Sequence, residues 1–463
     1  MGRRPSRPLA LPYPTRHNPA MATVLGLTLP DRATAPFCPS EVEGSIAVPA
    51  GIPLPTRIAR FVGPGLLIAV GYMDPGNWAT DIAAGSGYGF DLLFVVAGAS
   101  LAAILLQSLA LRLGIASGLD LAEACRRRYA RVPNLILWAL AEIAILATDV
   151  AEVLGGALAI KLLLGLPLWA GIMLTACDML IVVGLKGRGF RQVEAIVGGL
   201  VGTIALCFLI ELLIVPPDMA ALAAGLVPDF GHLTQPGALA VAIGIVGATV
   251  MPHNLYLHSS IVQTREIPDN EAEKRKAILI GDGDSAISLL LAALVNGAIL
   301  ALAAGAFHAH GHIGVTGIDE AYRLLSPITG LKAAALFFGI ALFASGQSST
   351  FTGTIAGQVI LEGFLHLKIP CWQRRIITRA IAIVPAMIGI LIFGDHGVGP
   401  MLVLSQIVLS LQLPFAIWPL IRAAGDRSIM GGLAAGILPQ AIAWLLFSII
   451  TGANIWLLAS LFA

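Results

Sequence analysis

The sequence predicts an all-α polytopic membrane protein built from two inverted five-helix repeats and an eleventh helix. Its 463 residues are 57% hydrophobic and only 12% charged, whereas about a quarter of the residues in a soluble domain are charged. Many apolar runs approach the roughly 20 residues that cross a hydrocarbon core about 30 Å thick. A pair of helix-breaking motifs at equivalent places in the chain indicates the two halves.

Clusters of charge, proline and glycine divide the apolar sequence into eleven predicted spans. These spans are 61–85, 91–113, 134–160, 167–185, 194–215, 237–263, 278–306, 331–363, 376–393, 399–422 and 440–462. Residues 51–462 therefore form one predicted transmembrane domain. It consists of a first repeat at 61–215, a second repeat at 237–422 and the eleventh helix at 440–462.

The segment before the first span differs from the rest of the chain. Residues 1–50 are rich in proline and arginine and contain no long apolar run. A cleavable signal peptide needs an apolar core of about 7–15 residues. We therefore expect a disordered cytoplasmic tail.

Basic residues predict the orientation in the membrane, because short loops that carry them stay on the cytoplasmic side. Every second boundary is basic, through Arg57, Arg60, Arg126, Arg127, Arg128, Arg131, Lys186, Arg188, Arg191, Lys274, Arg275, Lys276, Arg374, Arg375, Arg422 and Arg427. The alternate loops carry Asp91, Asp218, Asp229, Asp319, Glu320 and Asp395. This pattern predicts an N-terminus inside and, after an odd number of spans, a C-terminus outside.

The first and sixth spans are interrupted at their centres. Span 1 carries DPGN at 74–77, and span 6 carries GATVMPHNLYLHSS at 247–260. Proline removes a backbone donor and clashes with the preceding helical turn, so both spans should be broken helices. Because five spans separate the breaks, the second half enters the membrane from the opposite side. Paired breaks in inverted halves are typical of a transporter site near the bilayer midplane.

Asp74 gives the first break its chemistry. An aspartate deep in hydrocarbon costs at least about 2.5 kcal/mol on insertion scales, and span 1 offers it no nearby lysine or arginine. A mobile cation is a suitable partner. Asn77 adds an amide oxygen, and unwinding frees carbonyls such as that of Gly71. These hard oxygen ligands alone suit sodium, magnesium or calcium.

Met251 changes the expected cation. It directly precedes Pro252, where its thioether can lie beside freed carbonyls such as that of Ala248. A soft thioether favours transition metals over magnesium and calcium, so the combined set favours manganese or iron. The alternative is that Met251 only packs, as methionines in membrane helices often do.

Ionisable residues near the breaks suggest a proton path. His253 follows the second break and titrates near physiological pH in water. Span 3 carries Glu142, Asp149 and Glu152, of which the last two share a helix face. Arg379 lies deepest in span 9 and is the expected counter-ion. The alternative is a purely structural cluster of salt bridges.

Other candidate residues are weaker. Span 10 holds Gln406 and Gln412, either of which can face a cavity. The outer-loop sequence FHAHGH places His308, His310 and His312 at every second residue. These histidines could bind a metal in an extended chain, or they could simply belong to a solvated loop. The sequence lacks a phosphate-binding loop of the Walker type, so ATP-driven pumping is not expected.

The motifs DPGNWATD, MPHNLYLHS, SSTFTGTIAGQ and SLQLPFA resemble those of the natural resistance-associated macrophage protein (Nramp) family of proton-coupled divalent metal transporters. The resemblance covers residues 40–462 and implies a LeuT-type fold. It implies symport of protons with Mn²⁺ or Fe²⁺, and also Cd²⁺ or Co²⁺, across the inner membrane of a bacterium. It implies no enzymatic activity, no cofactor, no binding of nucleic acid and no obligate protein partner. The expected partners are the metal ions, the protons and the lipid bilayer.

The resemblance also assigns roles to individual residues. The metal-binding set it implies is Asp74, Asn77, Met251, the carbonyls of Gly71 and Ala248, and Gln406 in occluded states. The proton pathway it implies is His253, Asp149, Glu152 and Arg379, with Asn296 as a supporting polar group. Gly71 stands where alanine is common, a departure that should alter local unwinding more than selectivity.

Three alternatives stay open at this stage. A sodium-coupled carrier of organic solutes with the same fold would use helix ends to hold a carboxylate, which Asp74 would repel. A magnesium-selective carrier is disfavoured by Met251. A metal-sensing or scaffold membrane protein without transport would signal through a large soluble domain, and the sequence shows none.

Overall fold

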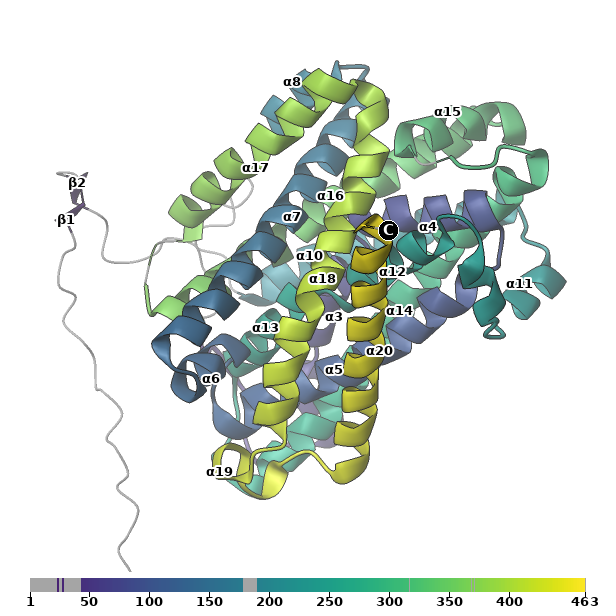
Figure 1. Ribbon diagram of the computed structural model, residues 1–463. Coiled ribbons are helices and arrows are strands. Elements are labelled where there is room, and N and C mark those ends of the chain that lie inside the picture. The colour runs from purple at the N-terminus through teal and green to yellow at the C-terminus, as the bar shows by residue number, and fades with distance from the viewer. Residues whose placement is uncertain are drawn as a thin grey trace, which may run out of the picture.

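The computed structural model describes residues 23–24, 27–28, 43–177, 190–315, 317–367, 369 and 371–462. Within these residues the chain is almost entirely helical (Figure 1). Nine of the described helical segments are long and apolar enough to cross a membrane. The predicted class of an all-α polytopic membrane protein is therefore confirmed.

The first half of the bundle begins with a broken span. Its helices are α3 (Pro64–Gly71), α4 (Pro75–Tyr88), α5 (Leu93–Ser117), α7 (Arg131–Leu164), α8 (Leu168–Thr175) and α10 (Phe190–Ile214). The two parts of span 1 are α3 and α4. The predicted span 167–185 is described only up to residue 177, where it contains α8.

The second half repeats this pattern. Its helices are α12 (Ala238–Val250), α13 (Pro252–Ile261), α14 (Glu271–Ala306), α16 (Lys332–Leu365), α17 (Cys371–Phe393) and α18 (Val398–Ala424). Span 6 is divided into α12 and α13. The eleventh helix is α20 (Ile437–Phe462), which lies beside α18 (Figure 1).

Short elements connect these helices. The short helices are α2 (Leu54–Phe61), α6 (Leu121–Arg128), α11 (Met219–Gly225), α15 (Ile318–Thr329), α19 (Arg427–Met430), η1 (Phe230–Thr234), η2 (Val262–Thr264), η3 (His308–His310), η4 (Asp395–Gly397) and η5 (Gly431–Leu433). Four two-residue strands form two pairs: β1 (Thr23–Val24) with β2 (Leu27–Thr28), antiparallel, and β3 (Ile46–Ala47) with β4 (Arg265–Glu266), parallel. The predicted tail at 1–50 thus includes the described strands β1, β2 and β3, and most of residues 1–42 lie outside the described residues.

Both breaks have a local cause. At the first, the Asp74 carboxylate accepts the Asn77 backbone N–H at 2.8 Å and so caps α4, whose first residue is Pro75. Aspartate is a favoured capping residue, and proline suits the first helical position. At the second, Met251 has a φ of 41°, a conformation that costs a non-glycine residue about 1–3 kcal/mol. Surrounding packing must therefore hold this break in place.

The helix packing buries both breaks. The broken helices α3 and α4 pack on α14, α12 packs on α5 and α18, and α13 packs on α5 and α16. By contrast, α10, α17 and α20 leave most of their apolar surface exposed at the periphery, as expected for helices that face lipid. The two breaks consequently lie inside the protein and away from the lipid-facing surface.

One loop prediction is wrong. The sequence places Arg374 and Arg375 in a basic loop before a span that starts at 376, but α17 already begins at Cys371. Both arginines lie within this helix and are buried. The physical reason is that each has a carboxylate partner on α7, described below, which compensates for its burial.

Candidate functional site

The two breaks meet at a single buried point. The Asn77 amide nitrogen of α4 donates to the Asp74 carboxylate at 2.8 Å and to the carbonyl oxygen of Ala248 in α12 at 3.1 Å. Asp74, Asn77 and Ala248 are each at most 1% exposed. The structure thus joins acceptors that are far apart in sequence.

Met251 and Gly71 belong to the same cluster. The Asn254 amide nitrogen donates to the Met251 sulfur at 3.4 Å. A Cβ atom added to Gly71 would lie 2.4 Å from that same nitrogen. The Gly71 carbonyl accepts the Asp74 backbone N–H at 3.3 Å. The absence of a side chain at residue 71 therefore makes room for Asn254 beside Met251.

The acceptors of this cluster are not fully satisfied. Within the described residues, Asp74 Oδ2 and Gln406 Oε1 are buried without a hydrogen-bond partner. A buried carboxylate oxygen with no donor is costly, and a cation would relieve that cost. In that part of the chain, no three His, Cys, Asp or Glu side chains are arranged to hold a metal. The candidate donor set is instead mixed: a carboxylate, an amide, a thioether and carbonyls.

Gln406 of α18 lies against the first break. A Cβ on Gly76 would lie 1.8 Å from the side-chain amide nitrogen of Gln406, and a Cβ on Gly247 would lie 2.0 Å from the backbone carbonyl oxygen of Gln406. Glycines in both broken helices therefore allow α18 to approach the site. Nothing in the sequence indicates that Gly76 and Gly247 leave space for Gln406.

We expect alanine at Gly76 to displace Gln406 and lower the affinity of this site for a divalent cation about tenfold, as loss of a supporting group near a metal typically does. Isothermal titration of the purified protein measures this affinity. The matched control is Gly87→Ala on the same helix, where an added Cβ has no neighbour within 4 Å. A folded Gly76→Ala protein with wild-type affinity would show that the position of Gln406 is unimportant.

Asn296 of α14 supports the first break. Its amide nitrogen donates to the Tyr72 carbonyl at 2.9 Å and approaches the Asn77 amide oxygen at 3.4 Å. It therefore holds both the unwound turn and the Asn77 side chain.

The predicted charged network forms between α7 and α17. Arg375 contacts Asp149 at 2.7 Å and Glu152 at 3.2 Å, and all three are at most 2% exposed. Arg374 pairs with Glu142 at 2.8 Å. The two helices are thus joined by a ladder of ion pairs.

Arg379 has a smaller part than the sequence analysis assigns to it. Its guanidinium lies 3.7 Å from Glu152, farther than that of Arg375. Depth in the apolar run was therefore a poor guide to the main counter-ion. Arg375 lies one turn earlier on the helix and faces both carboxylates.

His253 connects this network to the second break. It lies one residue after Pro252 on α13, is 2% exposed, and approaches the Thr148 hydroxyl of α7 at 3.4 Å. Thr148 directly precedes Asp149. The structure therefore places His253 between the candidate metal site and the buried ion pairs.

Some buried polar residues were missed by the sequence analysis. Asp81 of α4 is 1% exposed, and its Oδ2 has no hydrogen-bond partner among the described residues. Gln107 contacts the His258 ring at 2.9 Å and donates to the Tyr72 hydroxyl at 2.8 Å. Asp81 stands seven residues after Asp74, so helical spacing could have indicated it. No spacing in the sequence indicates that Gln107, His258 and Tyr72 contact one another.

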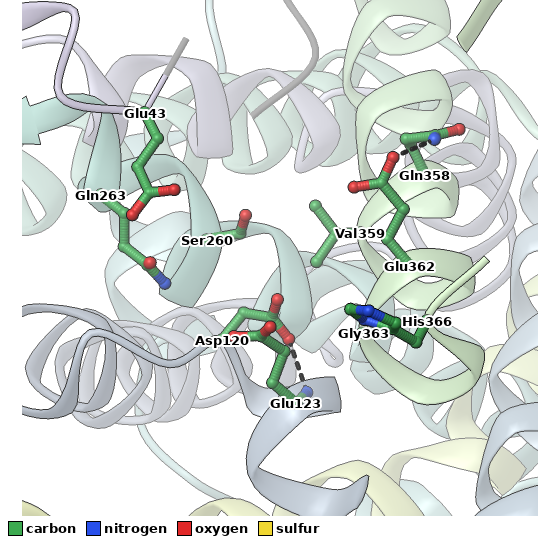
Figure 2. A pocket seen from close by; sticks show the side chains of 10 residues that line it. All are labelled: Glu43, Asp120, Glu123, Ser260, Gln263, Gln358, Val359, Glu362, Gly363 and His366. Atoms are coloured by element: carbon green, nitrogen blue, oxygen red, sulfur yellow. Dashed lines mark hydrogen bonds between the residues drawn. The ribbon is translucent and has the colours of Figure 1, made fainter. Parts of the chain in front are cut away.

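A polar pocket of about 200 Å³ lies at the end of α13 that is distant from the break (Figure 2). Its acidic and basic lining residues are Glu43, Asp120, Glu123, Glu362 and His366. Burial, and then the neighbouring Glu123, raises the pKa of Asp120. Ser260 lines this pocket and lies near the end of α13, so most of this helix, a length of about 13 Å, separates the pocket from the break.

Two broken helices meeting inside an inverted bundle define a membrane protein of the LeuT-type fold. This class is supported by the solved structure of MHP1, a nucleobase-cation-symport-1 family transporter, which has a TM-score of 0.59 at 14% identity over 91% of this chain and 92% of that chain. At this identity the similarity shows the fold alone.

The family is shown by closer similarities. The family model described as natural resistance-associated macrophage protein-like matches residues 65–460, and the chain belongs to this family. A divalent metal cation transporter MntH of Ralstonia nicotianae is 58% identical over 93% of this chain and 97% of its own length. The solved manganese transporter of Eremococcus coleocola has a TM-score of 0.85 at 36% identity, over 91% of this chain and 90% of that one. The predicted family and LeuT-type fold are confirmed.

Proposed function

We propose that this protein takes up divalent transition metal ions, with Mn²⁺ or Fe²⁺ as the natural substrate and Cd²⁺ and Co²⁺ also accepted. The observation that carries the proposal is the buried, unpartnered Oδ2 of Asp74 at the meeting point of two broken helices. The Asn77 amide and the Ala248 carbonyl lie next to this carboxylate, and Met251 adds a thioether at the second break. The names of the relatives, a divalent metal cation transporter and a manganese transporter, support it.

Metal binding requires a local change at Asn77. In the structure its amide nitrogen faces the Asp74 carboxylate and the Ala248 carbonyl. A cation that replaced this nitrogen would be held by the same two acceptors, and the amide would turn to offer its oxygen. Met251, the Gly71 carbonyl and Gln406 complete the proposed set of ligands.

We propose alternating access as the transport cycle, with a cytoplasmic N-terminus, an outer C-terminus and a location in the inner membrane. The start of α3 is held by Asp284, which accepts the Gly63 and Gly65 backbone N–H groups at 3.1 and 2.8 Å. Arg265 donates to the Phe61 and Val62 carbonyls, both at 2.9 Å. Release to the cytoplasm would break these contacts, and the acidic pocket beyond α13 would receive the metal.

Protons are the proposed co-substrate. Asp74, His253, Asp149 and Glu152 form a buried series from the metal site to the ion pairs of Arg375. Metal charge at Asp74 would favour release of a proton along this series, because like charges in a low-dielectric interior repel strongly. Arg379 contributes through its longer contact with Glu152.

Uptake into proteoliposomes tests the function. We expect Cd²⁺ or Mn²⁺ to enter together with protons, which a pH-sensitive dye trapped inside detects as acidification. Excess Mn²⁺ outside should compete with Cd²⁺, whereas the same excess of Mg²⁺ should not. Metal entry without acidification would exclude proton coupling, and the absence of metal entry would exclude the function itself.

The thioether should determine selectivity against hard cations. We expect Met251→Ala to lower by about tenfold the Ca²⁺ concentration that halves Cd²⁺ uptake, because the remaining ligands are oxygen atoms that suit calcium. The control is Met430→Ala, which removes a methionine that is 3% exposed in α19. Unchanged competition by Ca²⁺ in Met251→Ala would remove the argument from the thioether.

A further inference from the structure

An apolar groove of about 390 Å³ is lined by residues of α7, α18 and α20 and includes no residue of the candidate metal site. Figure 1 shows these three helices as neighbours at one side of the bundle. The lining residues of the groove include Tyr129, Pro133, Ile136, Phe415, Trp418 and Phe447. Ile136, Phe415 and Trp418 are 54%, 44% and 45% exposed. Because these helices are long enough to span a membrane, lipid chains surround the exposed side of the groove.

The groove has a well-packed wall. Trp418 and Trp444 lie edge to face with their ring centres 5.0 Å apart, and Phe447 lies 5.6 Å from Trp418. Two prolines, Pro414 and Pro419, interrupt the hydrogen-bond pattern of α18 beside it, and proline bends a helix. The depression is therefore formed by aromatic packing and proline geometry together.

A basic residue follows the groove lining along α18. Arg422 follows Trp418 by four residues on α18, so the two side chains share a helix face. Tyr129 also lines the groove. Burial raises its pKa, and Arg128, a hydrogen bond with Trp418 and then Arg422 oppose that rise.

The charge of Arg422 is uncompensated in the part of the chain that the structure describes, where no ion pair includes it. Arg128, in contrast, pairs with Asp426 at 2.7 Å. Hydrogen bonding by Ser428, and then by Arg128, lowers the pKa of Asp426 to about 2. Asp426 thus stays ionised and neutralises Arg128, which leaves the Arg422 charge for another anion.

We propose that this groove is a binding site for one anionic phospholipid, whose acyl chain lies along Phe415 and Trp418 and whose phosphate lies beside Arg422. Basic residues between membrane helices commonly bind anionic headgroups. Tryptophan and tyrosine favour the boundary between hydrocarbon and headgroups, which is where Trp418 and Tyr129 would lie. The shape of the groove fits an acyl chain, and the positive charge of Arg422 favours an anionic headgroup over a neutral one.

Tryptophan quenching tests the proposal on the full-length protein in phosphatidylcholine nanodiscs. Brominated phosphatidylglycerol or brominated phosphatidylcholine is titrated in, and subtracting the signal of Trp418→Phe isolates the Trp418 contribution. We expect half-maximal quenching at an about fivefold lower mole fraction of the anionic lipid, the preference that one arginine near an anionic headgroup produces.

Arg422→Gln should abolish this preference, whereas Arg427→Gln, which alters an exposed arginine of α19, should leave it intact. If Arg422→Gln does not fold, the wild-type preference should still decrease as salt screens the headgroup charge. Equal quenching by the two lipids would reduce the groove to ordinary lipid contact and overturn the proposal. A preference that survives Arg422→Gln or high salt would also overturn it.

Discussion

Replacing Asp74 with asparagine should lower the initial rate of Mn²⁺ uptake by about 10- to 100-fold. A contact to a charged group is worth roughly 1.5–3 kcal/mol, and each 1.4 kcal/mol corresponds to about a factor of ten. Asparagine has nearly the same size and also caps helices well, so the start of α4 should persist. The change therefore isolates the negative charge at the proposed metal site. Radioactive ⁵⁴Mn²⁺ uptake into proteoliposomes is the measurement.

The control for this substitution is Asp218→Asn. Asp218 also caps a helix, α11, by accepting backbone N–H groups, but it lies in an exposed loop. We expect it to leave uptake unchanged. Wild-type uptake by the Asp74→Asn protein would remove Asp74 from the metal site and leave the proposed function without its central ligand.

Replacing Arg375 with methionine should destabilise the protein by about 3–5 kcal/mol, the usual loss when one partner of a buried ion pair is removed. Asp149 and Glu152 would both keep buried charge without their nearest guanidinium, which lies 2.7 and 3.2 Å away. Methionine preserves much of the apolar volume of the arginine stem, so a cavity contributes little. Unfolding of the purified protein in mixed micelles measures the change.

Companion variants separate charge from packing at this position. Adding Asp149→Asn to Arg375→Met should recover part of the lost stability, because Asp149 then carries no uncompensated charge while Glu152 keeps its contact with Arg379 at 3.7 Å. Arg379→Met should cost less, since its contact with Glu152 is 3.7 Å. Equal losses for Arg375 and Arg379 would contradict the ranking that the distances imply. Arg127→Met, at an exposed site, serves as the surface control.

The fold and the core of the candidate site were predictable because they depend on local chemistry. Apolar runs of membrane length indicate spans whatever their neighbours are. Pro75 and Pro252 break helices through their own geometry, and the structure breaks the chain at these points. Asp74 in hydrocarbon demands a cation or a polar cavity. The structural effect of such residues can therefore be predicted from the sequence without knowledge of their tertiary contacts.

The partners of the charged residues were less predictable. Arg374, Arg375 and Arg379 lie within two turns of α17, and their order in the sequence does not say which of them faces α7. That depends on where the helix begins and how it is rotated against its neighbour. A start at Cys371 rather than at 376 brings Arg375 onto Asp149 and Glu152.

Close approaches of backbone and side chain were not visible either. Gly76 and Gly247 matter because Gln406 of a third helix occupies the space that their side chains would fill. The contacts of Gln107 with Tyr72 and His258 likewise join three helices. Spacing along one helix contains no information about such encounters.

Hydropathy, helix breakers and ligand chemistry therefore specify the bundle, the two breaks and the kind of ion that suits them, since each is a property of a short segment. Tertiary packing alone decides that Arg375 is the main counter-ion, that Gln406 reaches the first break, and that an apolar groove opens between α7, α18 and α20. The reason is physical: these features depend on the relative rotation and depth of helices from distant parts of the chain, which only the complete packing of the bundle determines.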